Sequence, residues 1–298
     1  MYRFTIFTPC FNSSAFIHRV FNSLSSQTFK DFEWYVINDA STDSTHDLIS
    51  EFIKTAHFKV VYHNLEKNQG LHNNINQAVR DARGEFLVLY GHDDEIQPDA
   101  LDTFDKLLKK YNSPDIGAVY ALANDQNGNL VGKKYPKDEF VSDYWTQFFV
   151  YENEAEKFQC FRTSYLREFY PLPTEQDKVQ PGGWLWGMMA TKYKAVFVNK
   201  VLRIYYTNVS TSITNSYKGR KHKARMNYNY YTYWVNKFQY HIHGNTKRRF
   251  RGFGGYVSYA ILAGVGYVES VSNIQKLSDR AIVALMFPIG YVINKFVK

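Results

Sequence analysis

The stretch Leu87-Val88-Leu89-Tyr90-Gly91-His92-Asp93-Asp94-Glu95 joins an apolar run of strand length to a glycine, a histidine and two adjacent carboxylates. In α/β domains, polar residues that follow a buried strand lie at the carboxyl edge of the sheet, where ligands bind. Hard cations such as Mg²⁺ take oxygen ligands. Where few carboxylates bind such a cation, substrate phosphates usually supply the remaining ligands. The stretch therefore predicts a divalent ion that grips a diphosphate. A second interpretation is that Asp94 or Asp99, near Pro98, caps the next helix.

Strand-like and helix-like segments alternate along the first third of the chain. Apolar runs typical of strands lie at residues 4–8, 32–37, 59–62 and 85–90. Segments with apolar residues at helical spacing lie between them, at residues 15–27, 45–55 and 71–83. Strands separated by helices of about 10–15 residues indicate βαβ units. The pattern therefore predicts an α/β domain with a mainly parallel, Rossmann-like sheet flanked by helices.

The rest of the sheet domain is less regular in sequence. After the Asp pair, the pattern predicts a helix at 98–111, a strand at 116–121 and its hairpin partner at 130–135. Residues 136–180 show no regular pattern. A further helix is expected at 182–191, followed by strands at 195–198 and 202–206. We therefore expect a sheet domain over residues 1–215 and a helical, basic C-terminal region over residues 216–298.

The composition is that of a globular protein without a disulfide framework. Of 298 residues, 45% are hydrophobic and 21% are charged, which excludes a disordered chain. The two cysteines, Cys10 and Cys160, fit a reducing compartment. The first residues form a strand pattern that leads straight into a polar loop, so no signal peptide is expected. These features predict a cytoplasmic location.

Positive charge is concentrated in the C-terminal region. The chain carries a net charge of +8, but residues 216–298 hold 14 Lys or Arg and 2 Asp or Glu, a balance of +12. Such asymmetry points to an anionic surface or polymer. A basic cluster at 247–251 precedes apolar stretches at 255–268 and 281–293, each shorter than the ~20 residues that a membrane-spanning helix needs. This arrangement favours peripheral contact with an anionic membrane leaflet.

Two other interpretations of this region stay open. Residues 217–243 interleave bases with tyrosines, a pattern that also occurs in nucleic-acid-binding surfaces. We rank a nucleic-acid partner low, because no RNA- or DNA-binding module is recognisable and the tyrosine spacing also fits a helix packed on the sheet domain. The region is alternatively an ordinary helical cap with a solvated charged face.

Four polar loops carry a resemblance to a known family. Their sequences are Thr8-Pro9-Cys10-Phe11-Asn12, Asn38-Asp39-Ala40-Ser41-Thr42-Asp43-Ser44-Thr45, Asn68-Gln69-Gly70-Leu71 and His92-Asp93-Asp94. In this order they resemble the family 2 glycosyltransferases, which have the GT-A fold. The resemblance covers residues 1–110 and, more weakly, 111–215. It implies a nucleotide-sugar donor such as a UDP-sugar, bound by Thr8, Pro9, Phe11, Asn12, Asp39, Asn68, Gly70, His92, Asp93 and Asp94.

The resemblance implies specific roles for several of these residues. Phe11 corresponds to the aromatic that packs on the nucleotide base, and the alternative is a core phenylalanine. Asp39 corresponds to the carboxylate that accepts a hydrogen bond from a uracil N–H. Its alternative is a turn or cap residue, although Asp43 is the better candidate for that role. Asn68 and Gly70 match an Asn-x-Gly that brings the backbone close to the nucleotide sugar, whereas Gly70 is otherwise a turn residue.

The metal position departs from the family pattern. The usual Asp-x-Asp reads Gly91-His92-Asp93 here, so the first carboxylate is missing. Asp93 keeps the position that ligates Mn²⁺ or Mg²⁺ in the family. His92 and Asp94 are candidates to replace part of the lost contact, and His92 suits a donor or solvent contact better than a metal ligand. Asn208 occupies a position where the family often has a histidine near the metal.

The catalytic base is also displaced from its usual position. Inverting transfer requires a carboxylate that deprotonates the acceptor hydroxyl as it attacks the sugar. In the family this residue precedes a Trp-containing helix, here Gly182-Gly183-Trp184-Leu185-Trp186, with glycines where the acid is expected. The nearest acids are Asp177 and Glu175, of which we favour Asp177. A solvated loop charge is the alternative for both.

These features predict an inverting glycosyltransferase that moves a sugar from a UDP-sugar to a hydroxyl of a glycan or lipid-linked glycan. The resemblance implies bacterial cell-surface polysaccharide biosynthesis, at the inner face of the cytoplasmic membrane. The departures at Gly91 and Gly182 motivate a second hypothesis, a non-catalytic sugar-nucleotide-binding protein on the same fold.

Overall fold

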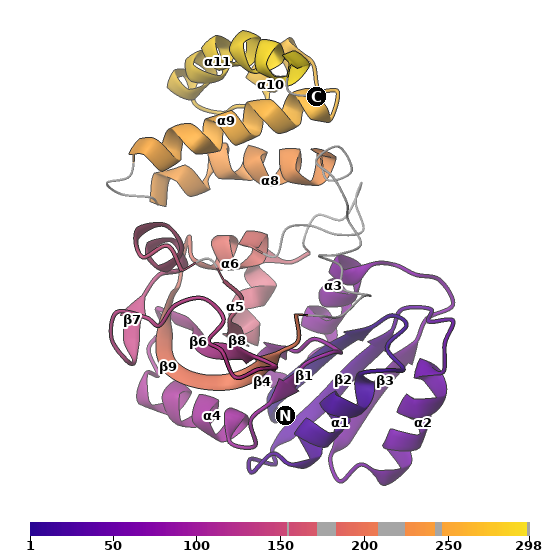
Figure 1. Ribbon diagram of the computed structural model, residues 1–298. Coiled ribbons are helices and arrows are strands. Elements are labelled where there is room, and N and C mark those ends of the chain that lie inside the picture. Colours follow the sequence, from indigo (N-terminus) through magenta and orange to yellow (C-terminus); the bar gives the residue numbers. More distant parts are fainter. Residues whose placement is uncertain (154, 172–182, 208–223, 242–245, 297–298) are drawn as a thin grey trace. The chain divides into compact units, whose positions relative to one another are not determined.

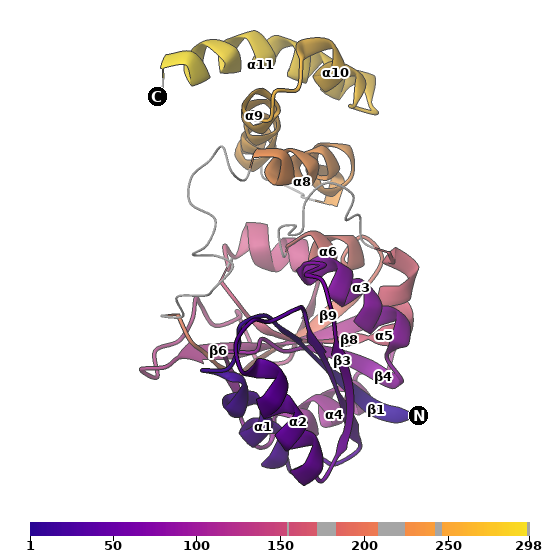
Figure 2. The same ribbon diagram turned by 90° about the vertical axis from the view of Figure 1, so that its right-hand side faces the viewer.

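The computed structural model describes residues 1–153, 155–171, 183–207, 224–241 and 246–296 (Figure 1 and Figure 2). The chain divides into two compact units. The first comprises Met1–Thr174 and Lys192–Val209, and the second comprises Glu175–Thr191 and Ser210–Lys298. This division differs from the expected one in that the segment containing α6 (Gly183–Met189) groups with the C-terminal helices.

The first unit is built on one mixed sheet. The strand order is β3-β2-β1-β4-β8-β6-β9-β5, and β7 pairs with β9. Strands β1 to β4 pair in parallel, while β8 runs antiparallel to both β4 and β6. The strands are β1 (Tyr2–Cys10), β2 (Phe32–Asn38), β3 (Lys59–Asn64), β4 (Gly84–Leu89), β5 (Glu95–Ile96), β6 (Ile116–Asp125), β7 (Phe140–Ser142), β8 (Phe158–Arg162) and β9 (Lys194–Tyr205). The predicted α/β fold is confirmed.

Helices cover both faces of the sheet (Figure 2). The main helices of this unit are α1 (Ile17–Ser25), α2 (Thr45–Thr55), α3 (Leu71–Asp81) and α4 (Ala100–Lys110). Helices α1, α2 and α4 share one hydrophobic core with the sheet. In α1, buried Ile17, Val20 and Leu24 are three and four residues apart, which places them on one helix face. Helix α3 lies on the opposite face of the sheet.

The region of residues 136–180 contains strands that the sequence pattern did not reveal. Strand β8 lies in the middle of the sheet, and its Phe158, Cys160 and Phe161 are fully buried. A five-residue apolar segment carries too little periodicity to be assigned without its partners. The two strands expected at 195–198 and 202–206 are one strand, β9, which pairs with β6 through register shifts. The expected hairpin partner at 130–135 is reduced to a bridge between Asn124 and Leu130.

The second unit is helical. Its C-terminal helices are α8 (Ala224–Asn236), α9 (Thr246–Leu262), α10 (Tyr267–Ser272) and α11 (Leu277–Phe296). Helix α9 lies between α8 and α11 (Figure 1 and Figure 2). Gly252 allows α9 to approach α8, because a Cβ at this position would lie 2.0 Å from the Trp234 ring. Among the described residues, no helix combines the length and the hydropathy that crossing a membrane requires.

Candidate active site

The loops that follow β1, β2, β3 and β4 lie at one edge of the sheet, because these strands are parallel and in register. The residues predicted to bind the donor lie in these loops or in the last residues of β1. Hydrogen bonds between the loops fix them relative to one another.

Asn12 ties the first loop to the second. The Asn12 backbone N–H donates to Ser41 Oγ at 2.9 Å, and the Thr42 backbone N–H donates to Asn12 Oδ1 at 2.9 Å. Asn12 and Ala40 both have left-handed backbone conformations, with φ of 49° and 59°. Such conformations are uncommon for residues other than glycine and cluster at functional sites. Asn12 therefore shapes the loop edge, through both its backbone and its side chain.

Asp43 is the turn residue of the second loop, as the sequence suggested. Its carboxylate accepts hydrogen bonds from the backbone N–H groups of Ser14 at 3.0 Å and Thr45 at 3.1 Å. Burial works against the charged form, but hydrogen bonds from Thr45 and Ser14 outweigh it and lower the pKa of Asp43 to about 2. The carboxylate is therefore ionised at neutral pH and joins the start of α2 to the loop before α1.

Asp39 holds the Asn-x-Gly loop in place. The backbone N–H groups of Gln69 and Gly70 donate to its two carboxylate oxygens at 2.7 and 2.9 Å. In return, the Asn68 amide donates to the Asp39 carbonyl at 3.1 Å. Gly70 has φ of 84° and ψ of 158°, a conformation that only glycine adopts readily. Each carboxylate oxygen can still accept a second hydrogen bond.

Phe11 and Thr8 have opposite environments although both lie on the same segment. Phe11 is 46% exposed, which excludes the alternative of a core phenylalanine. Thr8 is fully buried, and its hydroxyl accepts a hydrogen bond from Trp34 Nε1 at 3.1 Å. The Thr8 side chain therefore faces the core, which leaves its backbone for the predicted contact with the donor. Pro9 is half-buried, and its carbonyl contacts His92.

Asp94 is fully buried and bound within the protein. Arg203 from β9 donates to Asp94 Oδ2 through Nε, at 2.9 Å, and through Nη2. The Tyr206 backbone N–H donates to the other oxygen at 3.0 Å. Burial raises the pKa of the Asp94 carboxyl, and the Arg203 guanidinium opposes that shift. Asp94 thus positions the loop, which differs from its expected role as a donor contact and from its alternative role as a helix cap.

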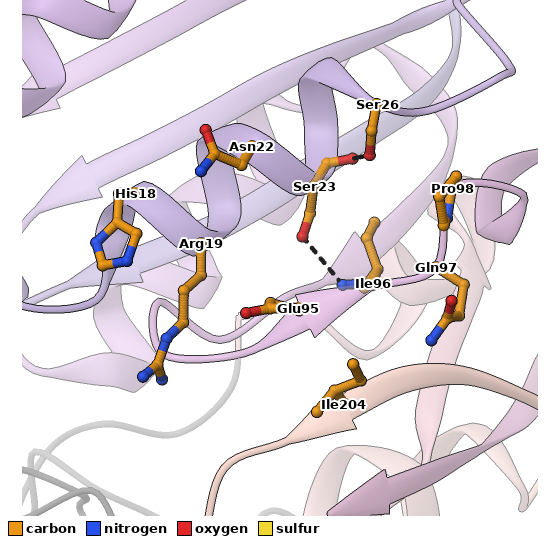
Figure 3. A pocket seen from close by; sticks show the side chains of 10 residues that line it. All are labelled: His18, Arg19, Asn22, Ser23, Ser26, Glu95, Ile96, Gln97, Pro98 and Ile204. Atoms are coloured by element: carbon orange, nitrogen blue, oxygen red, sulfur yellow. Dashed lines mark hydrogen bonds between the residues drawn. The ribbon is translucent and has the colours of Figure 1, made fainter. Parts of the chain in front are cut away.

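Arg19 is a second residue that fixes the loop after β4. It reaches from α1 and donates from Nη1 to the Asp93 carbonyl at 2.9 Å, and its guanidinium lies 3.7 Å from the centroid of the Tyr206 ring. Beside it, α1, β5 and β9 line a cavity of about 550 Å³ (Figure 3). Two of its lining residues are joined by a hydrogen bond: the Ile96 backbone N–H donates to Ser23 Oγ at 3.2 Å and fixes α1 against β5.

Sequence reasoning missed Arg19, Arg203 and Tyr206 as positioning residues. The available signal was a single arginine, Arg203, within an apolar strand segment. A charged residue in such a place is buried only when it is paired.

Asp93 and His92 carry the polar atoms that remain available. Within the described residues, the Asp93 carboxylate has no hydrogen-bond or ion-pair partner. His92 Nδ1 lies 3.2 Å from the Pro9 carbonyl, which only accepts, so Nδ1 carries the proton in this arrangement. His92 Nε2 is buried and, in the described part of the chain, has no hydrogen-bond partner. Both side chains can therefore contact a ligand.

Gly91 makes room for the two carboxylates that follow it. A Cβ at this position would lie 3.0 Å from Asp93 Oδ1 and 3.0 Å from Asp94 Oδ2. Arg203 holds Asp94 in place, so that oxygen has little freedom to move. Position 91 therefore has little space for the side chain of the aspartate that the Asp-x-Asp pattern has there.

The described residues fit a metal site that the donor completes. The described residues contain no group of three or more His, Cys, Asp or Glu that could enclose an ion. A single available carboxylate, Asp93, fits Mn²⁺ or Mg²⁺ that takes its other ligands from a diphosphate and from water. This part of the chain thus fits a metal bound together with the donor, and does not form a preformed cage.

The two candidate bases, Asp177 and Glu175, lie outside the described residues, as does Asn208. The neighbouring helix α6 is described from residue 183. Within the second unit, its Trp184 packs against Tyr233 of α8, with ring centroids 4.6 Å apart.

Comparison with known proteins identifies the family of this chain. Residues 5–169 match the family described as glycosyl transferase family 2. Because this match spans more than half of the chain, the protein belongs to family 2 of the glycosyltransferases and is a glycosyltransferase.

Individual relatives are bacterial glycan-synthesising proteins. The chain is 28% identical over 227 residues to GalNAc(5)-diNAcBac-PP-undecaprenol β-1,3-glucosyltransferase from Campylobacter jejuni, with 72% of this chain and 68% of the relative covered. It is 24% identical over 217 residues to glycosyltransferase GlyA from Streptococcus pneumoniae, with 68% of this chain but 30% of that protein covered.

Solved structures confirm the GT-A fold. Residues 1–349 of TarS from S. aureus, in complex with UDP-GlcNAc, align with a TM-score of 0.63 at 15% identity, covering 98% of this chain and 91% of that one. The mannosyltransferase PcManGT from Pyrobaculum calidifontis, in complex with GDP-Man and Mn²⁺, aligns with a TM-score of 0.58 at 17% identity, covering 99% and 87%. At these identities the likeness shows the fold alone.

Proposed function

We propose that this glycosyltransferase is an inverting enzyme that moves a sugar from UDP to a hydroxyl of a glycan or lipid-linked glycan, in the assembly of a bacterial cell-surface polysaccharide. The main support is the arrangement in which Asp39 holds the Asn68–Gly70 loop at the edge of the sheet. In the same group of loops, Phe11 is exposed and Asp93 keeps an available carboxylate.

The donor contacts follow from the groups left available. Asp39 accepts two backbone hydrogen bonds and has acceptor capacity left for a uracil N–H. The exposed ring of Phe11 offers a flat surface for the base. His92 Nε2 is a buried acceptor for a hydroxyl of the donor. Pro9, Asn12, Asn68 and Gly70 shape the backbone around these contacts.

Asp93 would hold Mn²⁺ or Mg²⁺ together with the diphosphate. When bound, such an ion supplies positive charge that offsets the charge on the leaving diphosphate. The complex of PcManGT with Mn²⁺ supports this proposal by analogy of fold. Arg19 and Asp94 keep the Asp93 loop in position from two sides.

The transfer itself needs a base on the acceptor side. A carboxylate takes the proton of the acceptor hydroxyl while the oxygen of that hydroxyl bonds to the anomeric carbon. UDP leaves with the electrons of the broken C–O bond. We keep Asp177 as the first candidate for this base and Glu175 as the second.

The acceptor class bears on where the enzyme works. The name of the C. jejuni relative includes an undecaprenol-linked substrate. A lipid-linked acceptor of this chemistry would bring the present enzyme to the inner face of the cytoplasmic membrane. We propose no nucleic-acid partner.

Calorimetric titration tests the donor and metal proposals together. UDP and several UDP-sugars are titrated into wild-type protein and Asp93→Ala, with and without Mn²⁺. The control is Asp31→Ala, an exposed aspartate that precedes β2 at the opposite edge of the sheet. We expect Mn²⁺-dependent UDP binding that is lost in Asp93→Ala and retained in Asp31→Ala.

Other outcomes separate the hypotheses. Tight UDP binding that is indifferent to Mn²⁺ and to Asp93 would remove the metal proposal. Absence of binding to UDP and to every UDP-sugar would overturn the UDP proposal. Binding without turnover across many acceptors would favour the non-catalytic hypothesis that the departure at Gly91 suggests.

A further inference from the structure

Residues 281–293 of α11 are apolar on every side and, among the described residues, are covered on one side. Residues 281–293 contain no charged side chain. On the covered side, Val283 is fully buried and Phe287 is 8% exposed. Gly290 lies against α9, since a Cβ there would be 2.6 Å from the Val257 side chain. One face of α11 is therefore part of the core of the second unit.

The opposite face of α11 is equally apolar and is exposed. Leu285, Ile289 and Val292 are 74%, 61% and 54% exposed, and their spacing of four and three residues places them on one stripe. Leu277, at 76% exposed, begins the same stripe. We call these four residues the outer stripe. Exposed apolar surface that is contiguous in this way marks a site of interaction.

The helical unit that carries the outer stripe is rich in basic residues. Arg249, in the first turn of α9, lies 3.8 Å from buried Asp279, on the covered side of α11. The same turn presents exposed Lys247 and Arg251, with Phe250 also 53% exposed. Residues 216–298 as a whole carry a balance of +12. An exposed apolar stripe thus belongs to a strongly cationic helical unit.

We propose that the outer stripe of α11 docks on a membrane surface that contains anionic phospholipids, with the helix axis in the plane of the membrane. The apolar side chains enter the boundary between headgroups and acyl chains, and the basic residues attract the lipid phosphates. A second copy of the chain is a poorer occupant, because pairing would bring two regions of charge +12 together. Among the described residues, no helix is long and apolar enough to cross a membrane.

This docking goes beyond the proposed transferase reaction and is tested without it. Docking would bring the enzyme to a lipid-linked acceptor in the membrane, but vesicle binding needs neither donor nor acceptor. If vesicle binding fails while UDP-sugar transfer is observed, only the docking is wrong. If vesicles are bound and no transfer is observed, only the proposed function is wrong.

The test is co-sedimentation of the full chain with vesicles of phosphatidylcholine, with and without phosphatidylglycerol. The variant Leu285→Glu/Ile289→Glu places two charges on the outer stripe. The matched control Ile53→Glu/Val150→Glu introduces the same two charges at residues that are 40% and 56% exposed elsewhere. We expect wild type and control to bind vesicles that contain phosphatidylglycerol, and the outer-stripe variant to bind at least about tenfold more weakly.

The remaining outcomes overturn the proposal. Equal binding by the outer-stripe variant and the control would exclude the stripe as the docking surface. Failure of wild type to bind vesicles that contain phosphatidylglycerol would exclude the membrane. A wild-type dimer in analytical ultracentrifugation that the outer-stripe variant abolishes, without vesicle binding, would identify a second copy as the occupant. Far-ultraviolet circular dichroism of each variant shows that loss of binding is not loss of folding.

Discussion

Arg203 and Asp94 form a buried ion pair that joins β9 to the loop after β4, with Arg203 Nε 2.9 Å from Asp94 Oδ2. The pair is separated by 109 positions in sequence. It removes Asp94 from the set of available carboxylates and leaves Asp93 beside it without a partner among the described residues. The different environments of the two adjacent aspartates therefore depend on Arg203 and on the Tyr206 amide, which bind Asp94.

Arg203→Met should destabilise the protein strongly, because it leaves the Asp94 carboxylate buried and unpaired. Removing one partner of a buried pair costs about 3–5 kcal/mol in the free energy of unfolding. The control Lys200→Met breaks the exposed pair with Asp99 and should cost about 1 kcal/mol or less. Urea unfolding measures both. In a double variant with Asp94→Leu, part of the loss should be recovered, and strictly additive losses would contradict the coupling.

Gly91→Asp should weaken UDP binding in Mn²⁺ although it restores the Asp-x-Asp pattern. The new Cβ would lie 3.0 Å from oxygens of Asp93 and Asp94, and a third negative charge would be added beside them. We expect a loss of about tenfold in affinity, as for an interaction change of about 1.4 kcal/mol. Gly91→Ala separates the steric effect from the charge. Gly266→Asp, at a glycine with open space around it, should leave the calorimetric titration unchanged, whereas tighter binding by Gly91→Asp would refute this account.

Phe11→Ala should weaken UDP binding without affecting stability. The side chain is 46% exposed, so little core packing is lost, while stacking of an aromatic ring contributes about 0.5–1.5 kcal/mol. Calorimetry should show a decrease in affinity of about two- to tenfold, and Phe11→Tyr should retain most of it. Phe250→Ala, at a similarly exposed phenylalanine of the second unit, is the control. An equal effect of both alanine variants would argue against stacking at Phe11.

The stabilising contribution of Asp43 should depend on pH. Its pKa is about 2 in the folded protein, because Thr45 and Ser14 donate to the carboxylate, against an ordinary value of 3.8. The contribution is therefore complete above about pH 4 and is lost as pH falls towards about 2. The difference in free energy of unfolding between wild type and Asp43→Asn should shrink over this range. A difference that is constant with pH would contradict the assignment, and exposed Asp31→Asn is the control.

Lys157 should show a pH dependence of the same sign at alkaline pH. Burial lowers the pKa of its ammonium group from 10.5 to about 8. Between about pH 8 and 10.5 the unfolded chain binds more protons, so the stability of wild type relative to Lys157→Met should rise with pH in this window and stay constant below it. Exposed Lys134→Met is the control. Thermal unfolding across this pH range measures the effect. Unfolding temperatures of wild type and Lys157→Met that change in parallel with pH would disprove the shift in pKa.

Local chemistry determined much of the fold and of the donor edge. Alternation of strand and helix patterns located β1 to β4 and the helices between them, because each of these segments is long enough to show its period. The loops that carry Phe11, Asp39 and Asp93 were found from sequence, since each directly follows an apolar strand.

Strand β8 and the functions of individual carboxylates depend on the tertiary structure. β8 is only five residues long, and its place in the sheet comes from β4 and β6, which are distant in sequence. The sequence Asp93-Asp94 offers two equivalent carboxylates. Only the fold brings Arg203 and the Tyr206 amide to Asp94, because the partners of a buried charge are selected by packing and not by neighbours along the chain.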